Sequence, residues 1–372
     1  MKSLVKNTTL LILCFLFFFG GISHGASDVP ALRDCKDSTE RARIQSLING
    51  ARAEGKLAWW FNMIEPKMDK YIADGFKIYY GLPDLKFEFT YATNQATITN
   101  IEKLFQAKRP TPDVLWYAVW VWYKDLLARG KVMRYDSPMY KEYTLSHEIG
   151  NSMPGYWVSD SYCYNPVWNP AALAKAGIKD FNPTSWWDFA DPKLSKLISI
   201  GNIPQSHSYG LNALGWKKAL GDDWFKKIAN NKPGLYLKMA QGRDWVASGE
   251  YPVTLTNSAK TAETIKQTGV KVKMLYPKEG VVMLPFAPII LATAPHPNAA
   301  KLFIDYVRSA PGTKRVAESN VCLFYGRPGV KTTSEFLPGA ENVKAIPMDW
   351  NSITDQSVTE IQQWVVSIGL CY

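Results

Sequence analysis

Residues 37–61, DSTERARIQSLINGARAEGKLAWWF, contain the pattern that decides the fold of this chain. Asp37, with Glu40 three residues later, is typical of a capping box at the start of a helix. Four apolar residues then fall on one helical face: Ile44, Leu47, Ile48 and Ala51. Gly55 predicts the end of this helix, and the apolar run at 56–61 predicts a buried strand. The stretch therefore predicts a helix followed directly by a strand.

The same alternation continues on both sides of a central aromatic segment at 156–165. We expect strands at 87–91, 113–116, 197–201, 251–256 and 270–276, and a long extended run at 281–293. We expect helices at 65–79, 95–107, 298–309 and 354–368. Strands that alternate with helices predict an α/β fold with mostly parallel sheets.

The N-terminal 25 residues have the three parts of a secretory signal peptide. Lys2 and Lys6 precede an apolar run at 10–19, and small residues follow it up to Gly25. The run is shorter than the roughly 20 residues that a membrane helix needs. We therefore expect cleavage after Gly25 and a mature protein in the periplasm.

The size and charge of the chain limit what it can be. A chain of 372 residues exceeds the length at which one hydrophobic core usually stops growing, so we expect two lobes. The formal net charge is +10, but lysine and arginine are scattered, with no run of five. A nucleic-acid-binding surface usually gathers such charges, so we expect no nucleic-acid partner.

The cysteines left after the expected cleavage are Cys35, Cys163, Cys322 and Cys371. An even number in an exported chain predicts at least one disulfide, with three possible pairings. We expect Cys35 to pair with Cys371, because the ends of a chain often lie close together. A second bond would then join Cys163 to Cys322. No C-x-x-C motif occurs, which leaves a zinc or dithiol redox site without support.

Eight short segments of the chain match, in the same order, segments of a known protein family. They are AEGKLAWW (53–60), TPDVLW (111–116), YN (164–165), PTSWWDFADPK (183–193), SGE (248–250), YPKEG (276–280), APHPNAAKLFIDY (294–306) and RP (327–328). Together they resemble the extracellular solute-binding proteins of ABC transporters, in the ferric-iron, polyamine and phosphonate group. The resemblance covers nearly the whole mature chain.

This resemblance implies the type 2 periplasmic binding fold, an α/β fold with two lobes joined by two hinge strands. Lobe 1 would combine residues 28–155 with 285–372, and lobe 2 would be residues 156–284. The ligand would bind in the cleft between the lobes. The resemblance also implies a monomer without cofactor or catalytic activity, which delivers its ligand to a membrane permease of an ABC transporter.

Ligands of open α/β sheets bind beyond the carboxyl ends of the strands. That rule and the crossing segment give these candidate ligand-binding residues: Trp60, Asn62, Thr93, Asn94, Trp116, Tyr162, Ser206, Ser208, Thr256 and Asn257. Two of the loops place hydroxyl or amide groups at a helix start, where an anion is favoured. Residues of these types are also common as plain helix N-caps, and the sequence leaves both roles open.

The expected ligand is a small organic anion or a polar organic molecule. Ferric-binding members of the resembled group carry adjacent tyrosines after the strand that corresponds to 251–256, whereas this chain has TNS at 256–258. The candidate loops also lack Asp and Glu, so we expect no metal site. A ferric-iron-binding protein of the same fold remains the alternative. An exported hydrolase is a weaker one, because neither G-x-S-x-G nor H-E-x-x-H occurs after the expected signal peptide, residues 1–25.

Overall fold

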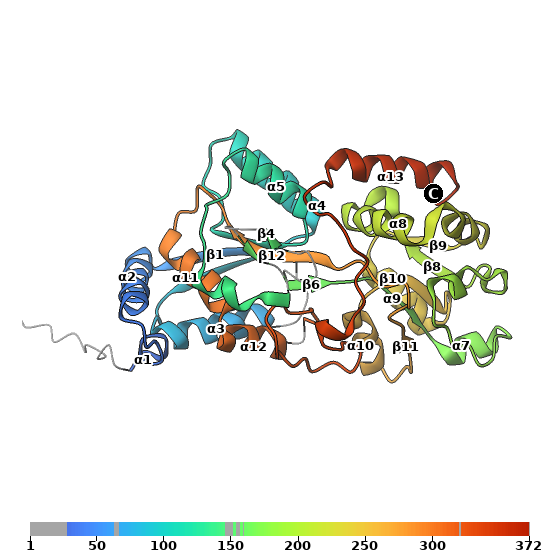
Figure 1. Cartoon of the computed structure of the whole chain (residues 1–372), viewed down its shortest axis with the longest axis horizontal. Helices are drawn as coiled ribbons and strands as arrows, with labels where there is room; N and C mark the ends of the chain where they lie inside the picture. Colours follow the sequence, from blue (N-terminus) through green and yellow to red (C-terminus); the bar gives the residue numbers. More distant parts are fainter. Residues whose placement is uncertain are drawn as a thin grey trace, which may run out of the picture.

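Two five-stranded sheets, one in each of two lobes, form the core of the computed structural model (Figure 1). The structure describes residues 28–62, 67–145, 152–153, 157–158, 160–319 and 321–371. The expected two-lobed α/β architecture is confirmed. The predicted signal peptide lies outside the described residues.

The first sheet has the strand order β2-β1-β3-β12-β6. Its strands are β1 (Lys56–Phe61), β2 (Lys86–Tyr91), β3 (Val114–Tyr117), β6 (Asp160–Tyr162) and β12 (Leu284–Ile290). β1 runs parallel to β2 and β3, whereas β12 is antiparallel to β3 and β6. The helices of this lobe are α1 (Pro30–Arg33), α2 (Ser38–Glu54), α3 (Met68–Tyr80), α4 (Asn94–Gln106), α5 (Trp120–Ala128), α11 (Pro297–Arg308) and α12 (Ala310–Glu318).

The second sheet has the order β11-β7-β10-β8-β9. Its strands are β7 (Asn165–Trp168), β8 (Ile198–Gly201), β9 (Gly234–Tyr236), β10 (Val253–Asn257) and β11 (Lys273–Met274). The helices around it are α7 (Pro170–Lys175), α8 (His207–Asn230), α9 (Met239–Ser248), α10 (Ala259–Gln267) and α13 (Asp355–Ser367). Short 3-10 helices and a small strand pair complete the described elements: η1 (Pro138–Glu142), η2 (Trp186–Ala190), η3 (Pro192–Leu194), η4 (Ile203–Gln205), η5 (Ala340–Asn342), β4 (Ser152–Met153) and β5 (Trp157–Val158).

The helix-to-strand unit that opened the sequence analysis folds as expected. Asp37 caps α2 by accepting a hydrogen bond from the Glu40 backbone N–H at 2.7 Å, and Gly55 ends the helix with φ 69°. In β1, Leu57, Trp59 and Phe61 are buried, while the residues between them are half-buried. This alternation places one face of the strand in the core of the first lobe.

The chain crosses between the lobes at the two expected places and at a third. β6 belongs to the first sheet and β7 to the second, and the chain returns from β11 to β12. After α12, an antiparallel bridge joins Ser161 to Phe324, and a parallel bridge then joins Val281 to Ala345. Tyr276 also donates a hydrogen bond to the Phe336 carbonyl at 2.8 Å. The segment after α12 therefore runs from the first lobe onto the second.

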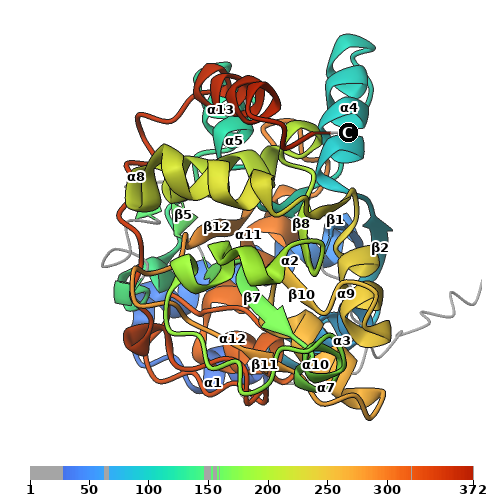
Figure 2. The ribbon, with the colours of Figure 1, turned by 90° about the vertical axis from the view of Figure 1, so that its right-hand side faces the viewer.

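The last helix, α13, packs on α8 of the second lobe (Figure 2). Val358, Ile361 and Val365 form its buried stripe, and Val358 lies so close to Gly210 of α8 that a Cβ there would meet it at 2.7 Å. The expected division had placed residues 285–372 in lobe 1, and the position of α13 differs from it. Its other boundaries stay a prediction.

The cysteine pairing expected for the chain ends is wrong. Cys35 lies just after α1 at the far end of the first lobe, and Cys371 follows α13 on the second (Figure 1). The structure records no disulfide between them, nor one between Cys163 and Cys322. The ends are apart because the chain finishes on the opposite lobe from the one where it begins.

Lys124 of α5 connects the first lobe to the segment that leads into α13. Its Nζ donates hydrogen bonds to three carbonyl oxygens, those of Trp350 at 3.0 Å, Asn351 at 2.8 Å and Ile353 at 2.6 Å. Burial lowers the pKa of Lys124. All three ammonium protons thus have acceptors in one stretch of backbone.

Replacing Lys124 by methionine should lower the free energy of unfolding by about 1–2 kcal/mol, because three carbonyl oxygens lose a charged donor. Urea unfolding at pH 7 would measure this. Lys70→Met is the matched control, since Lys70 forms an exposed pair with Asp74 and such pairs contribute roughly 0–1 kcal/mol. Equal effects of the two variants would contradict the view that Lys124 stabilises the contact between the first lobe and the segment before α13.

Candidate functional site

Four hydroxyl-bearing side chains meet where the crossing segment passes the start of α8. Tyr164 donates a hydrogen bond to Ser208 Oγ at 3.1 Å, and its own oxygen lies 3.4 Å from the Tyr162 hydroxyl. Ser206 Oγ lies 3.2 Å from Ser208 Oγ. We call Tyr162, Tyr164, Ser206 and Ser208 the hydroxyl cluster. It links a hinge strand to a helix N-terminus.

The local fold follows from the sequence after β8. Residues 202–205 form the short turn with η4, and Ser206 then caps α8 by accepting from the Tyr209 backbone N–H at 3.5 Å. Ser206 is therefore the N-cap, and Ser208 is not. The first backbone N–H that bonds back in the helical pattern is that of Gly210, to the Ser206 carbonyl at 2.9 Å. The N–H groups of His207 and Ser208 therefore have no acceptor in the helical pattern and are available at the helix start.

Electrostatics at this helix start favour a negative ligand. The α8 dipole presents partial positive charge at its N-terminus. Burial raises the pKa of Tyr162 to about 12, so its hydroxyl stays neutral at pH 7 and can donate. Burial also lowers the pKa of His207, against the opposing pull of Asp355 at 4.0 Å. The neighbourhood thus holds neutral hydrogen-bonding groups and a helix dipole.

The first lobe contributes a second polar pair at the ends of its strands. Asn62, directly after β1, donates to Asn94 Oδ1 at 2.7 Å. Thr93 caps α4 by accepting from the Ala96 backbone N–H at 3.3 Å. Trp60 is half-buried on β1. The structure therefore places Asn62 against Asn94 and gives Thr93 a capping role. The aromatic ring of Trp60 precedes Asn62 by two residues in the same strand end.

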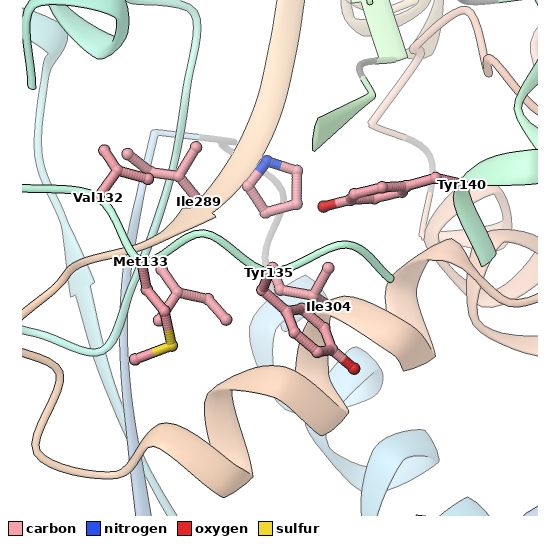
Figure 3. A pocket seen from close by; sticks show the side chains of 8 residues that line it. Val132, Met133, Tyr135, Tyr140, Ile289 and Ile304 are labelled. Atoms are coloured by element: carbon pink, nitrogen blue, oxygen red, sulfur yellow. The ribbon is translucent and has the colours of Figure 1, made fainter. Parts of the chain in front are cut away.

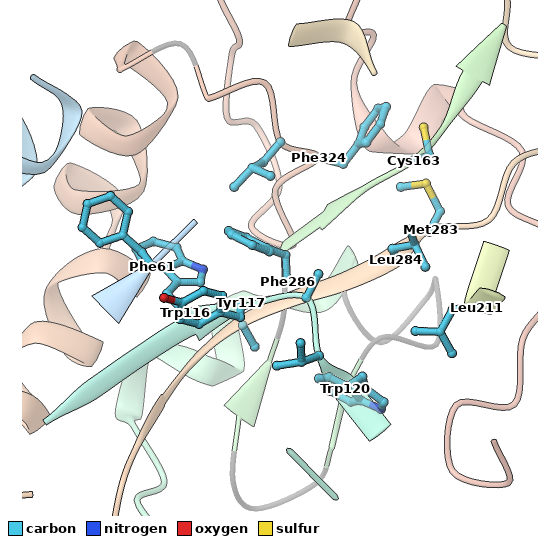
Figure 4. Packing of buried hydrophobic residues seen from close by; sticks show 14 of the residues in the cluster. Phe61, Trp116, Tyr117, Trp120, Cys163, Leu211, Met283, Leu284, Phe286 and Phe324 are labelled. Atoms are coloured by element: carbon cyan, nitrogen blue, oxygen red, sulfur yellow. The ribbon is translucent and has the colours of Figure 1, made fainter. Parts of the chain in front are cut away.

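Trp116, Thr256 and Asn257 are enclosed in the interiors of the lobes. Trp116 packs in the first lobe, 6.1 Å from the Phe286 ring (Figure 4). Thr256 Oγ1 accepts from the Gly201 backbone N–H at 2.5 Å. Asn257 Oδ1 accepts from Thr261 Oγ1 at 2.6 Å. All three side chains are fully buried, so their part in ligand binding stays a prediction.

Asn212 is the residue that the sequence did not reveal as special. It lies one helical turn after Ser208 in α8 and is fully buried, and neither its Nδ2 nor its Oδ1 has a hydrogen-bond partner among the described residues. A buried amide of this kind usually binds water or a ligand. The signal in the sequence was the i, i+4 spacing of Ser208 and Asn212 in a stretch of α8, 208–216, that carries no charged residue.

Two small cavities in the described part of the chain lie within the first lobe and away from the hydroxyl cluster. One, of about 10 Å³, is lined by Val132, Met133, Tyr135, Tyr140, Ile289 and Ile304, together with Pro288 and Ile290 (Figure 3). That volume holds about one water molecule. The other, of about 90 Å³, lies between Arg52 and Leu85. Neither cavity can hold a solute that contacts both lobes.

The described residues include no group of three or more His, Cys, Asp or Glu side chains that could hold a metal ion. Within the same ranges, no helix has the length and apolar character to cross a membrane.

Comparisons with known proteins agree with the two-lobed fold. The family model of the bacterial extracellular solute-binding proteins matches residues 64–319. An uncharacterised protein of Haemophilus influenzae is 27% identical over 223 residues, which are 54% of this chain and 60% of that protein. The match thus spans less than two thirds of that relative's length.

Solved structures of low sequence identity share the fold. The periplasmic binding protein AfuA of Actinobacillus pleuropneumoniae, solved with exogenous fructose-6-phosphate, has 20% identity and a TM-score of 0.67, covering 84% of this chain and 96% of that one. Iron-bound HitA of Pseudomonas aeruginosa has 17% identity and a TM-score of 0.63, covering 84% and 98%. A substrate-binding protein of an Agrobacterium tumefaciens ABC transporter has 12% identity and a TM-score of 0.68, covering 86% and 96%.

Proposed function

Since this chain belongs to the bacterial extracellular solute-binding proteins, we propose that it captures a small organic anion or polar organic molecule between its two lobes. The observation that carries this proposal is the hydroxyl cluster at the N-terminus of α8, beside a hinge strand. A ligand held there contacts the second lobe directly and lies at the crossing to the first.

The start of α8 supports an anionic group in particular. Its unbonded N–H groups and the two serine hydroxyls can donate to phosphate or carboxylate oxygens. Each charge-assisted hydrogen bond of this kind contributes roughly 1.5–3 kcal/mol. Asn212 adds a buried amide with both donor and acceptor capacity left over, which suits a sugar hydroxyl or a bridging water.

The tyrosines of the hydroxyl cluster and the residues at the end of β10 argue against the ferric-iron alternative. Ferric iron prefers anionic oxygen ligands, yet burial holds the pKa of Tyr162 at about 12 and raises the pKa of Tyr164 well above its ordinary value. The end of β10 provides Thr256 and Asn257, and Ser258 follows it, where a tyrosine pair would be needed. The described residues thus favour uncharged donors over a metal-ligand set.

The remaining parts of the proposal concern where and how the protein works. We propose cleavage after Gly25, a periplasmic monomer, and delivery of the ligand to a membrane permease of an ABC transporter. The chain itself would perform no catalysis. A soluble receptor of this kind needs only differential affinity between an open and a closed arrangement of its lobes.

A thermal-shift panel tests the ligand class. Hexose phosphates, small carboxylates, neutral sugars and ferric nitrilotriacetate would each be added to the mature protein. A ligand at 100 times its Kd stabilises by about 2.7 kcal/mol, which corresponds to roughly 5 °C or more. We expect this shift with an organic anion or polar solute and none with the ferric chelate. Stabilisation by ferric iron with a tyrosinate colour, or turnover of any compound, would refute the proposal.

A further inference from the structure

The segment of residues 347–367, which we call the C-terminal arm, is attached to the second lobe at both of its ends. At its start, Lys218 Nζ of α8 donates a hydrogen bond to the Pro347 carbonyl at 2.6 Å. Gly215 of α8 lies so close to Met348 that a Cβ at Gly215 would meet the methionine sulfur at 3.1 Å. At its end, α13 packs on α8. Both ends of the arm therefore rest on the same helix.

Between these two ends, the arm contacts the first lobe. The carbonyl oxygens of Trp350, Asn351 and Ile353 all accept hydrogen bonds from Nζ of Lys124 in α5. Figure 1 shows α5 on the first lobe and α13 on the second. The Trp350 and Ile353 side chains are buried, so this stretch of the arm is packed rather than loose. Separation of the lobes at this point must break the three hydrogen bonds or pull the arm off α8.

The arm also holds the start of α8, where the hydroxyl cluster lies. Gln362 Nε2 of α13 donates to the Ile203 carbonyl at 3.0 Å and to the Ser206 carbonyl at 3.3 Å. Ser206 is the N-cap of α8 and a member of the cluster. The close approach of the two helices depends on Gly210, because a Cβ there would lie 2.7 Å from Val358 Cγ1. The same helix thus fixes both the turn before α8 and the first turn of α8.

We propose that the C-terminal arm is a latch between the lobes, which couples their closure to the geometry of the ligand site. Lys124 and Gln362 are its positioning residues. Lys124 holds the arm on the first lobe, and Gln362 holds the N-terminus of α8 in the second. This inference rests on the proposed binding of the solute at the start of α8.

The coupling acts in both directions, because linkage between two sites is reciprocal. A solute at the start of α8 favours the latched arrangement of the lobes. Loss of the latch makes that arrangement a smaller fraction of the population, and the apparent affinity falls by the same fraction. Couplings of this kind change affinity by roughly fivefold or more.

Small-angle scattering of the ligand-free mature protein tests the latch without any solute. Lys124→Met removes the donor to all three carbonyl oxygens. We expect a larger radius of gyration, because the lobes then separate more often. Lys70→Met is the control, since Lys70 pairs with Asp74 on the surface of α3, and it should leave the radius unchanged. An unchanged radius for Lys124→Met would overturn the proposal, whatever the solute is.

An insertion variant tests the latch with all side chains in place. Two glycines inserted between Ile353 and Thr354 preserve the Lys124 hydrogen bonds and the Thr354 cap of α13, but they lengthen the connection between them. The radius of gyration should rise as it does for Lys124→Met. The same insertion after Gly269 is the matched control, because a Cβ at that position would meet nothing within 4 Å. Equal radii for the two insertion variants would show that the arm does not hold the lobes together.

Isothermal titration calorimetry tests the coupling to the ligand site, with the solute that raises the melting temperature of the wild type most. Lys124→Met and Gln362→Met should each weaken binding about fivefold or more. Gln356→Met is the matched control and should bind as the wild type does, since Gln356 bonds Glu360 on the exposed side of α13. Wild-type affinity for either Lys124→Met or Gln362→Met would contradict the coupling. If no solute binds the wild type, the proposed function fails, while the scattering experiments still decide whether the latch exists.

Discussion

Replacing Asp160 by alanine should lower the free energy of unfolding by about 3–5 kcal/mol, because it leaves the buried guanidinium of Arg308 without its carboxylate. Asp160 Oδ2 pairs with Arg308 Nη1, and both side chains are almost fully buried. The Gly326 backbone N–H also donates to Asp160 Oδ1 at 3.2 Å. One carboxylate thus joins the hinge strand β6 to the end of α11 and to the third crossing.

Urea unfolding followed by tryptophan fluorescence would measure this loss. Asp74→Ala is the matched control, since Asp74 pairs with Lys70 on the surface of α3 and such a pair contributes no more than about 1 kcal/mol. The double variant Asp160→Leu with Arg308→Met should recover most of the stability, because no buried charge remains. A loss below 1 kcal/mol for Asp160→Ala would contradict this role.

Replacing Ser208 by alanine should weaken ligand binding about tenfold or more, because a donor to the bound anion is lost. Ser208 Oγ accepts from the Tyr164 hydroxyl at 3.1 Å. Among the described residues, the change therefore leaves that hydroxyl with only its 3.4 Å hydrogen bond to the Tyr162 hydroxyl. Isothermal titration calorimetry with the solute that stabilises the wild type best would give the change in affinity.

Alanine variants of two serine N-caps, one inside the site and one outside it, distinguish an effect on ligand affinity from an effect on stability. Ser206 caps α8 inside the site, and Ser309 caps α12 by accepting from the Gly312 N–H at 3.2 Å. Losing either cap should cost about 1 kcal/mol of stability. Only Ser206→Ala should also lower affinity. Wild-type affinity for both Ser208→Ala and Ser206→Ala would show that the solute binds elsewhere.

The secondary structure was largely predictable because its causes are local. Apolar periodicity and a cap at Asp37 define α2, and Thr93 defines the start of α4. The two expected crossings are also present, since long extended runs have few alternatives in an α/β chain. The expected strand at 270–276 shrinks to β11, Lys273–Met274, which pairs only with β7 at the edge of the sheet.

The parts that the sequence did not predict depend on packing between distant segments. The amphipathic pattern of α13 showed that it has a buried face, but not that this face meets α8. The wrong pairing of Cys35 with Cys371 has the same origin, because it assumed that both cysteines lie on the same lobe. Likewise, the polarity of Asn257 could not reveal that Thr261, four residues later, donates a hydrogen bond to its Oδ1 inside the lobe.

Native mass spectrometry of the protein isolated from its own compartment tests the central claim most directly. The account predicts one small organic molecule bound per chain, anionic or polar, which leaves on denaturation and binds again to the refolded mature protein. The Ser208→Ala variant should carry less of it. An iron adduct with a tyrosinate charge-transfer band, retained by Ser208→Ala, would contradict the account.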